Sequence, residues 1–398
     1  MGLLLKIVLI IVVGAALLAF GIWLFLQQNQ FDEPEVAPAL RQPAPSITGS
    51  ARYQDGKFHN LENTVVMTQA AEPTQKKSGL FGNLYKFLFA KTPGAVPEQP
   101  LPSRKTDLFN LDPAENLVVW MGHSSYFIQL DGQRILIDPV FSQYASPVPG
   151  TNGAFAGTNI YTTDDIPQLD LLLISHDHWD HLDYPTIKGL QGKVKQVVTP
   201  SGVGSYFRQW GWPAAQILEG NWGDVFSSGN LDVHILPARH FSGRLFERNR
   251  TLWASFALIT PDHRYYLSGD TGYGQHFKAI GDAFGPFDLA ILECGQYNAN
   301  WANIHMMPEE TALAAIELQA SKVMAAHNSK FKLSRHSWQE PLERIKLASE
   351  SQPWHLLTPM IGELVDVDDN NQLFTEWWQP AEDGQIAEQA DSMRQPAG

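Results

Sequence analysis

The chain has 398 residues, of which 44% are hydrophobic, and its formal net charge is −14. This length can bury a large core, and the acidic balance argues against broad binding to nucleic-acid backbones, which needs clustered Lys and Arg. The single cysteine, Cys294, excludes an internal disulfide framework and a cysteine-rich metal cluster. The 13 histidines are therefore the main metal-capable side chains.

The chain begins with an apolar stretch. Residues 7–26 contain no charged side chain, and as a helix they would span about 30 Å, the thickness of the hydrocarbon layer of a bilayer. The sequence predicts an uncleaved transmembrane anchor over residues 1–28. The alternatives are a cleaved signal peptide and a buried helix of a soluble protein. Bulky residues at 22–26 occupy the place of a small-residue cleavage site, which favours the anchor.

The charges that flank this stretch predict its orientation. Lys6 precedes it, whereas Asp32, Glu33 and Glu35 follow it. Because positive residues tend to stay on the cytoplasmic side, we expect the rest of the chain to face away from the cytoplasm.

Residues 29–100 are predicted to form a tether and an amphipathic N-terminal arm. The tether is rich in Gln, Pro and Ala. Within the arm, residues 80–88 carry apolar side chains at the spacing of an amphipathic helix. This helix either packs on the main domain or lies on the membrane surface.

The predicted main domain covers residues 101–365 and begins with strands joined by turns. We expect strands at 116–120, 126–130, 134–137, 169–175, 233–236, 253–259, 264–267, 289–292 and 322–326. A helix is expected at 308–319, because it opens with Pro-Glu-Glu and continues rich in Ala and Leu. Hairpins followed by alternating strands and helices predict an α/β sandwich. Residues 366–398 are predicted to be a partly disordered C-terminal tail.

The strongest chemical signal directly follows the apolar strand at 169–175. Residues 175–183 read S-H-D-H-W-D-H-L-D. A solvated loop is the alternative, but such a loop needs no apolar strand to position it. His176 and His178 lie two apart in an extended segment, so both can bind one cation. Asp180 and His181 follow at a turn and can reach a second. Imidazole and carboxylate without thiolate suit zinc, and also manganese or ferrous iron.

This cluster resembles the H-x-H-x-D-H signature of the metallo-β-lactamase superfamily. More narrowly, the chain is similar to the N-acylphosphatidylethanolamine-hydrolysing phospholipase D family and its bacterial members. The similarity covers residues 117–331, with a weaker match at 53–58. It rests on ordered motifs: W-M-G-H-S-S at 120–125, L-I-D-P-V-F-S at 136–142, P-A-R-H-F at 237–241, S-G-D-T-G-Y at 268–273, F-G-P-F-D-L-A at 284–290, H-M-M-P-E-E at 305–310 and M-A-A-H at 324–327.

The resemblance implies a four-layer αβ/βα sandwich with two metal ions, expected to be zinc, in a cleft at the strand ends. The ligands that it implies are His176, His178 and His240 for the first ion, Asp180, His181 and His327 for the second, and Asp270 as a bridge between them.

The resemblance also implies the chemistry. A hydroxide that bridges the two metals would attack the phosphorus of a phosphodiester, with Asp180, Asp270 and His305 as catalytic residues. For His305, the roles are contact with the phosphate or the leaving group, or a bond to its own backbone at the helix start. Asp138 is expected to contact a ligand histidine rather than act as a base. His123 has a similar role or stabilises its loop.

The function implied is that of a membrane-anchored di-zinc phospholipase D. It would release N-acylethanolamine and phosphatidic acid from N-acylphosphatidylethanolamine or a similar phospholipid, at the periplasmic face of a bacterial inner membrane. Its expected partners are the membrane and this lipid or another small phosphodiester, but no nucleic acid. The sequence does not indicate the oligomeric state. Residues 293–297, Ile304 and 328–330 depart from the family pattern on the substrate side. The alternatives are a hydrolase of a lactone or phosphorylated sugar, and a non-catalytic, membrane-tethered binding protein.

Overall fold

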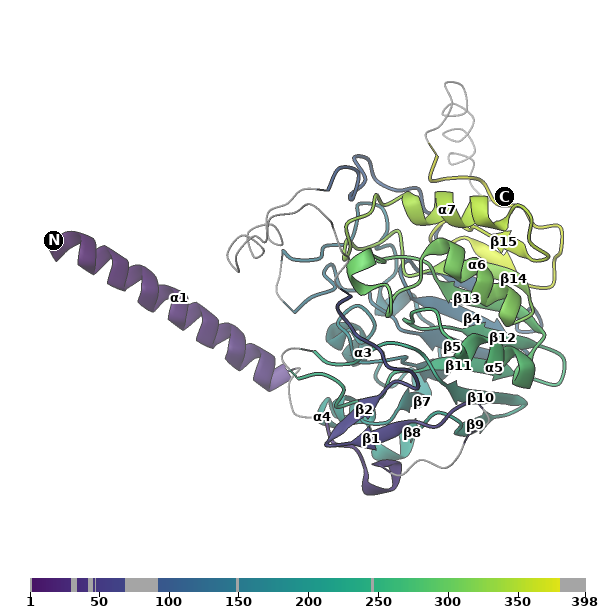
Figure 1. Cartoon of the computed structure of the whole chain (residues 1–398), viewed down its shortest axis with the longest axis horizontal. Coiled ribbons are helices and arrows are strands. Elements are labelled where there is room, and N and C mark those ends of the chain that lie inside the picture. Colours follow the sequence, from purple (N-terminus) through teal and green to yellow (C-terminus); the bar gives the residue numbers. More distant parts are fainter. Residues whose placement is uncertain are drawn as a thin grey trace.

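The computed structural model describes residues 2–29, 34–41, 46, 48–68, 92–147, 150–244 and 247–379. The amphipathic helix predicted at 80–88 lies outside these residues, as does the C-terminal tail from 380 onward. The described elements form two seven-stranded sheets, a two-stranded hairpin and the helices that cover the sheets (Figure 1).

The first sheet combines an antiparallel half and a parallel half. Its strands lie in the order β16 (Leu364–Asp366), β3 (Leu117–Trp120), β4 (Tyr126–Leu130), β5 (Gln133–Ile137), β6 (Leu169–Leu173), β7 (Val194–Pro200) and β8 (Ile217–Gly220). Pairing is antiparallel from β16 to β5 and parallel from β5 to β8. The parallel strands must be connected by crossovers, and these carry the helices.

The second sheet has the same division. Its order is β15 (His355–Leu357), β14 (Ala320–Ala326), β13 (Phe287–Glu293), β12 (Arg264–Leu267), β11 (Ser255–Ile259), β10 (Leu231–Leu236) and β9 (Val225–Ser228). Strands β15 to β12 are parallel, whereas β12 to β9 are antiparallel.

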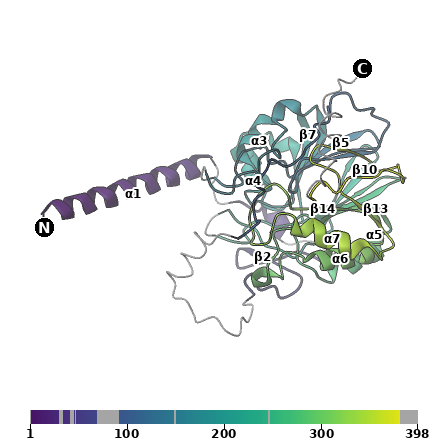
Figure 2. The same ribbon diagram turned by 90° about the horizontal axis from the view of Figure 1, so that it is seen from above.

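Alternating side chains place the two sheets face to face. In β6, Leu171 and Leu173 point into the core between the sheets, whereas Leu172 points into a second core on the outer face. Helices α3 (Tyr184–Gly189) and α4 (Gly204–Gln209) cover that outer face. Helices α5 (His276–Phe284), α6 (Pro308–Glu317) and α7 (Glu340–Ser349) cover the second sheet (Figure 2). The predicted four-layer sandwich is confirmed, and each predicted strand is present with its ends within two residues of the expected ones.

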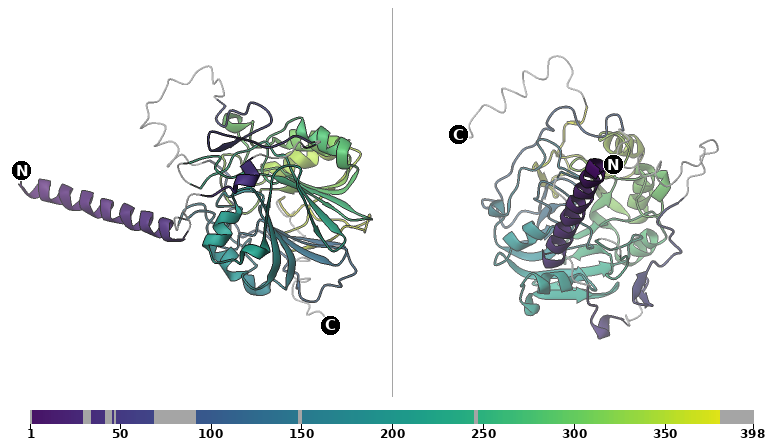
Figure 3. Two further views of the ribbon diagram at one scale, coloured as in Figure 1. Left: turned by 90° about the horizontal axis from the view of Figure 1, so that it is seen from below. Right: turned by 90° about the vertical axis from the view of Figure 1, so that its left-hand side faces the viewer.

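Helix α1 (Gly2–Asn29) extends away from the sandwich (Figure 3). Its segment Gly2–Leu24 is long and apolar enough to cross a membrane, and none of its most apolar window is buried. Helix α1 is therefore a candidate membrane span.

A short hairpin lies against the sandwich within the range that the sequence assigns to the N-terminal arm. Strands β1 (Arg52–Gln54) and β2 (Lys57–His59) are joined by Asp55 and Gly56, both at positive φ, as a two-residue hairpin turn requires. Phe58 is buried in the core, and Asn60 makes two hydrogen bonds with the backbone of His240. These hydrogen bonds hold the loop after β10 in place. This loop lies at the site described next.

Candidate metal centre

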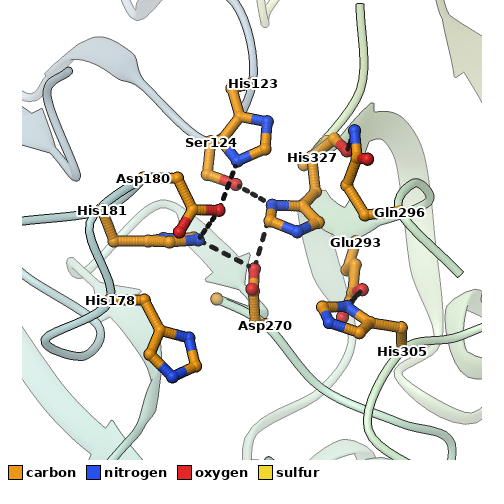
Figure 4. Close-up of polar contacts among 12 residues, drawn as sticks. His123, Ser124, His178, Asp180, His181, Asp270, Glu293, Gln296, His305 and His327 are labelled. Atoms are coloured by element: carbon orange, nitrogen blue, oxygen red, sulfur yellow. Dashed lines mark hydrogen bonds and ion pairs between the residues drawn. The ribbon is translucent and has the colours of Figure 1, made fainter. Parts of the chain in front are cut away.

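The strand ends bring the predicted ligands together at one edge of the sandwich (Figure 4). The histidine cluster follows β6, and His327 directly follows β14. His240 and Asp270 come shortly after β10 and β12, which run in the same direction. Because the carboxyl ends of strands with one direction share a sheet edge, these loops converge on one site.

The side chains form three overlapping groups, within each of which the potential ligand atoms lie within 4.8 Å of one another, and the third of them is Asp270, His305 and His327. The first group is His176, His178, His240 and Asp270. The second is His123, Asp180, His181 and His327. The sequence analysis predicted all residues of the first two groups as metal ligands except His123, which it expected to support a ligand or its own loop. Two cation-sized positions therefore lie side by side.

Asp270 lies between the first and second groups. Its Oδ2 is 3.8 Å from His176 Nε2 and 3.7 Å from His240 Nε2. Its Oδ1 is 3.1 Å from His181 Nε2 and also 3.1 Å from His327 Nδ1. One carboxylate oxygen thus faces each group, which is the geometry that the predicted bridging role requires.

Burial shapes the electrostatics of the site. It lowers the pKa values of His176, His240 and His327 well below their usual range, and neighbouring histidines lower them further. Burial also lowers the pKa of His178 to about 3. At neutral pH these imidazoles are neutral and offer a lone pair, the form that binds metal ions. For His181, burial acts in the same direction, but the carboxylates of Asp270 and Asp180 raise its pKa well above the usual value.

Several polar atoms of the site lack the hydrogen bonds that buried groups normally have. Among the described residues, His181 Nε2 and Asp270 Oδ1 are buried and make no hydrogen bond of normal geometry, although they lie 3.1 Å apart. His176 Nε2 and His178 Nδ1 face each other at 2.8 Å. Converging nitrogen and oxygen atoms without partners fit divalent cations, because a cation would satisfy all of them together.

Neighbouring side chains hold two of the predicted ligands in place. Asp138 Oδ2 lies 2.8 Å from His181 Nδ1, and both oxygens of Asp138 also accept hydrogen bonds from Ser175. The expected contact between Asp138 and a histidine that is predicted to be a ligand is present. The Nε2 atom of His123 lies 2.8 Å from Asp180 Oδ2, so His123 contacts a predicted ligand rather than only its own loop.

The sequence analysis did not identify the residues that hold the histidine loop, residues 175–183, in place. Asp177 is buried and accepts hydrogen bonds from Gly243, Thr251 and Tyr206. Arg244 donates to the backbone carbonyls of Asp177 and Leu182, each at 2.9 Å. Its guanidinium also lies 3.7 Å from the ring centre of Trp179.

The surroundings of His305 were also not foreseen. Its Nδ1 atom contacts Glu293 Oε1 rather than its own backbone. Its ring lies parallel to that of His327, with centroids 5.3 Å apart, and edge-on to that of His240. The structure therefore places His305 beside His240 of the first group and His327 of the second.

Comparisons with known proteins identify relatives of this chain. Residues 133–328 match the model of the β-lactamase superfamily domain. The chain is 36% identical over 373 residues to an uncharacterised protein of Mycobacterium tuberculosis, covering 92% of this chain and 97% of the relative. It is 31% identical over 277 residues to N-acyl-phosphatidylethanolamine-hydrolyzing phospholipase D 1 of Caenorhabditis elegans, covering 62% of this chain and 74% of that protein.

A solved structure shares the fold. It is isothiocyanate hydrolase from Delia radicum gut bacteria, with a TM-score of 0.50 and 19% identity over 63% of this chain and 98% of that chain. Together, fold and site define a metal-dependent hydrolase of the metallo-β-lactamase superfamily. Within this superfamily, the chain belongs to the same family as N-acyl-phosphatidylethanolamine-hydrolyzing phospholipase D 1 of Caenorhabditis elegans.

Proposed function

We propose that this protein is a membrane-anchored phosphodiesterase that cleaves N-acylphosphatidylethanolamine, or a phospholipid with a similar head group, and releases N-acylethanolamine and phosphatidic acid. The observation that carries the proposal is the pair of ligand groups that share Asp270 in a chain of this family. Zinc, two ions per chain, suits these ligands because they combine imidazole and carboxylate without thiolate; manganese and ferrous iron suit them as well.

In this proposal the first and second groups hold one cation each. His176, His178 and His240 bind the first, Asp180, His181 and His327 bind the second, and Asp270 binds both. Bound cations of this kind lower the pKa of a water that they share and neutralise negative charge that develops on phosphoryl oxygens.

Side chains carry out the other steps of the proposed reaction. Asp180 accepts a hydrogen bond from the attacking water, because its side chain is 13% exposed whereas that of Asp270 is 2% exposed. His123 orients Asp180 through the contact at 2.8 Å. His305 contacts the phosphate or the leaving group. Burial of most of these side chains lowers the local dielectric constant, which strengthens each of these interactions.

The N-terminal part would bring the site to its lipid. We propose that residues 1–28 anchor the chain, that 29–100 form the arm, that 101–365 form the hydrolase domain and that 366–398 form the tail. Tethering next to a bilayer raises the local concentration of a lipid substrate. The charges around α1 favour a single span in a bacterial inner membrane, with the hydrolase domain in the periplasm. A reporter fused to the C-terminus would test this, and a cytoplasmic signal would contradict it.

The reaction is tested by incubating the purified full chain, in detergent and loaded with zinc, with lipid phosphodiesters, lactones and phosphorylated sugars. We expect a mass gain of one water only for the lipid phosphodiesters, and about two zinc ions per chain by elemental analysis. Turnover of a lactone or a phosphorylated sugar alone would assign the site to another substrate. One ion per chain, or none, would contradict the two-cation site.

A further inference from the structure

The predicted ligands are not equally buried, and the difference shows where the site opens to solvent. His178 and Asp180 are partly exposed, as are His305 and Phe241, whose ring contacts that of His178. The other predicted ligands are buried, and these are His176, His181, His240, Asp270 and His327. A substrate would therefore reach the candidate cation positions from the side of the four partly exposed residues, which we call the mouth of the site.

An arginine lies at this mouth. The guanidinium carbon of Arg248 is 4.8 Å from the ring centre of Phe241, in a cation–π contact. The ring centre of Phe241 is in turn 4.5 Å from that of His178 and 4.8 Å from that of His240. One aromatic ring therefore separates the guanidinium from two predicted ligands of the first metal ion.

The backbone holds Arg248 in this place. The N–H of the next residue, Asn249, donates to the carbonyl of Ser242 at 3.0 Å, and the Asn249 carbonyl accepts from the N–H of Phe58 at 2.8 Å. The side-chain oxygen of Asn249 also accepts from the N–H of Ser242, which directly follows Phe241. These hydrogen bonds close the loop, so Phe241 and Arg248 lie side by side although they are seven positions apart.

The guanidinium of Arg248 is placed to bind an anion. The residue is exposed, and among the residues that the structure describes no carboxylate forms an ion pair with it. The neighbouring Glu247 pairs instead with Arg250. The phenyl ring of Phe241 accepts no ordinary hydrogen bond, so the N–H groups of Arg248 remain available. Their fork matches two oxygens of a phosphate group, and their charge is opposite to that of a phosphodiester.

We propose that Arg248 is a substrate-binding residue that donates hydrogen bonds to the phosphoryl oxygens of a phosphodiester bound at the metal centre. The inference rests on the proposed phosphodiesterase function and adds a residue that selects an anionic substrate. The two ring contacts of Phe241 place the guanidinium within about 9 Å of the His178 ring, a gap that a bound phosphate and the long arginine side chain can close. A neutral lactone offers no such charge, so Arg248 favours a phosphodiester over it.

Substitution of Arg248 in the zinc-loaded full chain tests this role. For Arg248→Gln we expect kcat/KM to fall about 10-fold, the lower end for a hydrogen bond to a charged group. The loss should be the same on N-acylphosphatidylethanolamine in detergent and on the water-soluble diester bis(p-nitrophenyl) phosphate. It should lie mainly in KM, because a phosphodiester carries its charge before it reacts. Arg248→Lys keeps the charge but not the fork, so its loss should be smaller, about 3-fold.

A matched control and a binding measurement separate this contact from general effects of charge. Arg250→Gln removes a nearby arginine that pairs with Glu247, so we expect wild-type rates. Calorimetric titration of the zinc-loaded chain with inorganic phosphate needs no turnover. The Kd for phosphate should rise about 10-fold for Arg248→Gln and stay unchanged for Arg250→Gln. The zinc content of every variant should equal that of the wild type.

Each other outcome would overturn the proposal. Unchanged rates and phosphate affinity for Arg248→Gln would mean that Arg248 does not contact the substrate. Equal losses for Arg250→Gln would indicate a general effect of positive charge, and a loss of zinc would indicate a structural role. A loss on the lipid alone would mean that Arg248 contacts the lipid assembly instead. If the wild type cleaves neither substrate, the proposed function is wrong, whereas the phosphate titration still tests Arg248.

Discussion

Helix α1 and the metal centre depart in opposite directions from the usual distribution of side chains. In the most apolar window of α1, apolar side chains are exposed, with no residue buried. In the metal centre, histidines and carboxylates are buried, and some of their atoms have no hydrogen-bond partner. Soluble proteins rarely show either arrangement, since exposed apolar patches and buried unpaired polar groups both cost free energy.

Each region presents atoms that a partner outside the polypeptide would cover or bind. A bilayer would cover the apolar surface of α1, and cations would satisfy the converging nitrogen and oxygen atoms of the site. The two requirements are also independent, because α1 lies outside the sandwich that carries the site. Substitutions should therefore impair catalysis and membrane attachment separately.

The largest effect is expected where both ligand groups meet. Asp270→Asn keeps the size of the side chain but removes its charge, so neither group retains its shared anionic ligand. We expect kcat on the lipid phosphodiester to fall at least about 10³-fold, with less zinc bound and an unchanged circular dichroism spectrum. Asp282→Asn is the control, because Asp282 is an exposed partner of Lys278 on α5. Near-wild-type turnover by Asp270→Asn would contradict the role given to Asp270.

Removal of α1 tests whether this helix serves substrate capture. A chain that starts at residue 34 keeps the whole sandwich but lacks the apolar helix. We expect its kcat/KM on lipid vesicles to fall about 10²-fold, because the gain in local concentration from tethering is lost. Its rate on a water-soluble diester such as bis(p-nitrophenyl) phosphate should stay at the wild-type value. Equal rates of both chains on vesicles would show that α1 does not serve substrate capture.

The accuracy of the predictions from the sequence differs between these two regions and the rest of the fold. The apolar run of α1 and the strand β6 could be predicted because each is continuous in the chain. Strand β7 was missed, because Lys195 and Gln196 interrupt its apolar pattern, and its identity depends on pairing with β6 and β8. The hairpin of β1 and β2 was missed because three-residue strands give no periodicity.

The same distinction holds within the site. The histidine loop could be predicted because its candidate metal-binding side chains are adjacent in sequence. Arg244 could not, since it acts on Asp177, 67 positions earlier. Glu293 lies only 12 positions from His305, yet a single glutamate at the end of an apolar strand is not distinctive. The sequence thus predicts the candidate ligands and their partners Asp138 and His123, whereas Arg244 and Glu293 become visible only in the fold.

A smaller effect is expected for a residue that supports a ligand without touching the cations. Asp138→Asn would weaken the contact with His181 Nδ1, which now lies at 2.8 Å. We expect affinity for zinc to fall about 10- to 100-fold, the usual result when the partner of a metal-binding histidine is changed. Competition with a fluorescent chelator measures this affinity. An unchanged zinc affinity would mean that Asp138 serves only Ser175.

Lys330 contrasts with the metal centre, because its buried amine finds its hydrogen-bond partners within the chain. Its Nζ donates to the backbone carbonyls of Met121, at 3.1 Å, and Val140, at 2.8 Å. Two N–H donors suffice for two carbonyls, so the neutral amine fits this position. Burial accordingly lowers the pKa of Lys330 to about 7.

This pKa makes stability depend on pH in a defined direction. An unfolded lysine has a pKa of about 10.4, so between pH 7 and 10.4 the unfolded chain binds more protons than the folded protein. The contribution of Lys330 to the free energy of unfolding therefore rises with pH in this window and is constant below about pH 7, where both states carry the proton. Relative to Lys330→Met, the wild type should gain roughly 1 kcal/mol per pH unit between pH 7.5 and 9.5, as measured by urea unfolding of zinc-loaded protein. Lys278→Met is the control, because the exposed Lys278 pairs with Asp282, which raises its pKa further above this window. Between pH 7.5 and 9.5, the wild type and Lys278→Met should then differ by a constant free energy of unfolding. The same result for Lys330→Met would show that the amine stays charged in the core.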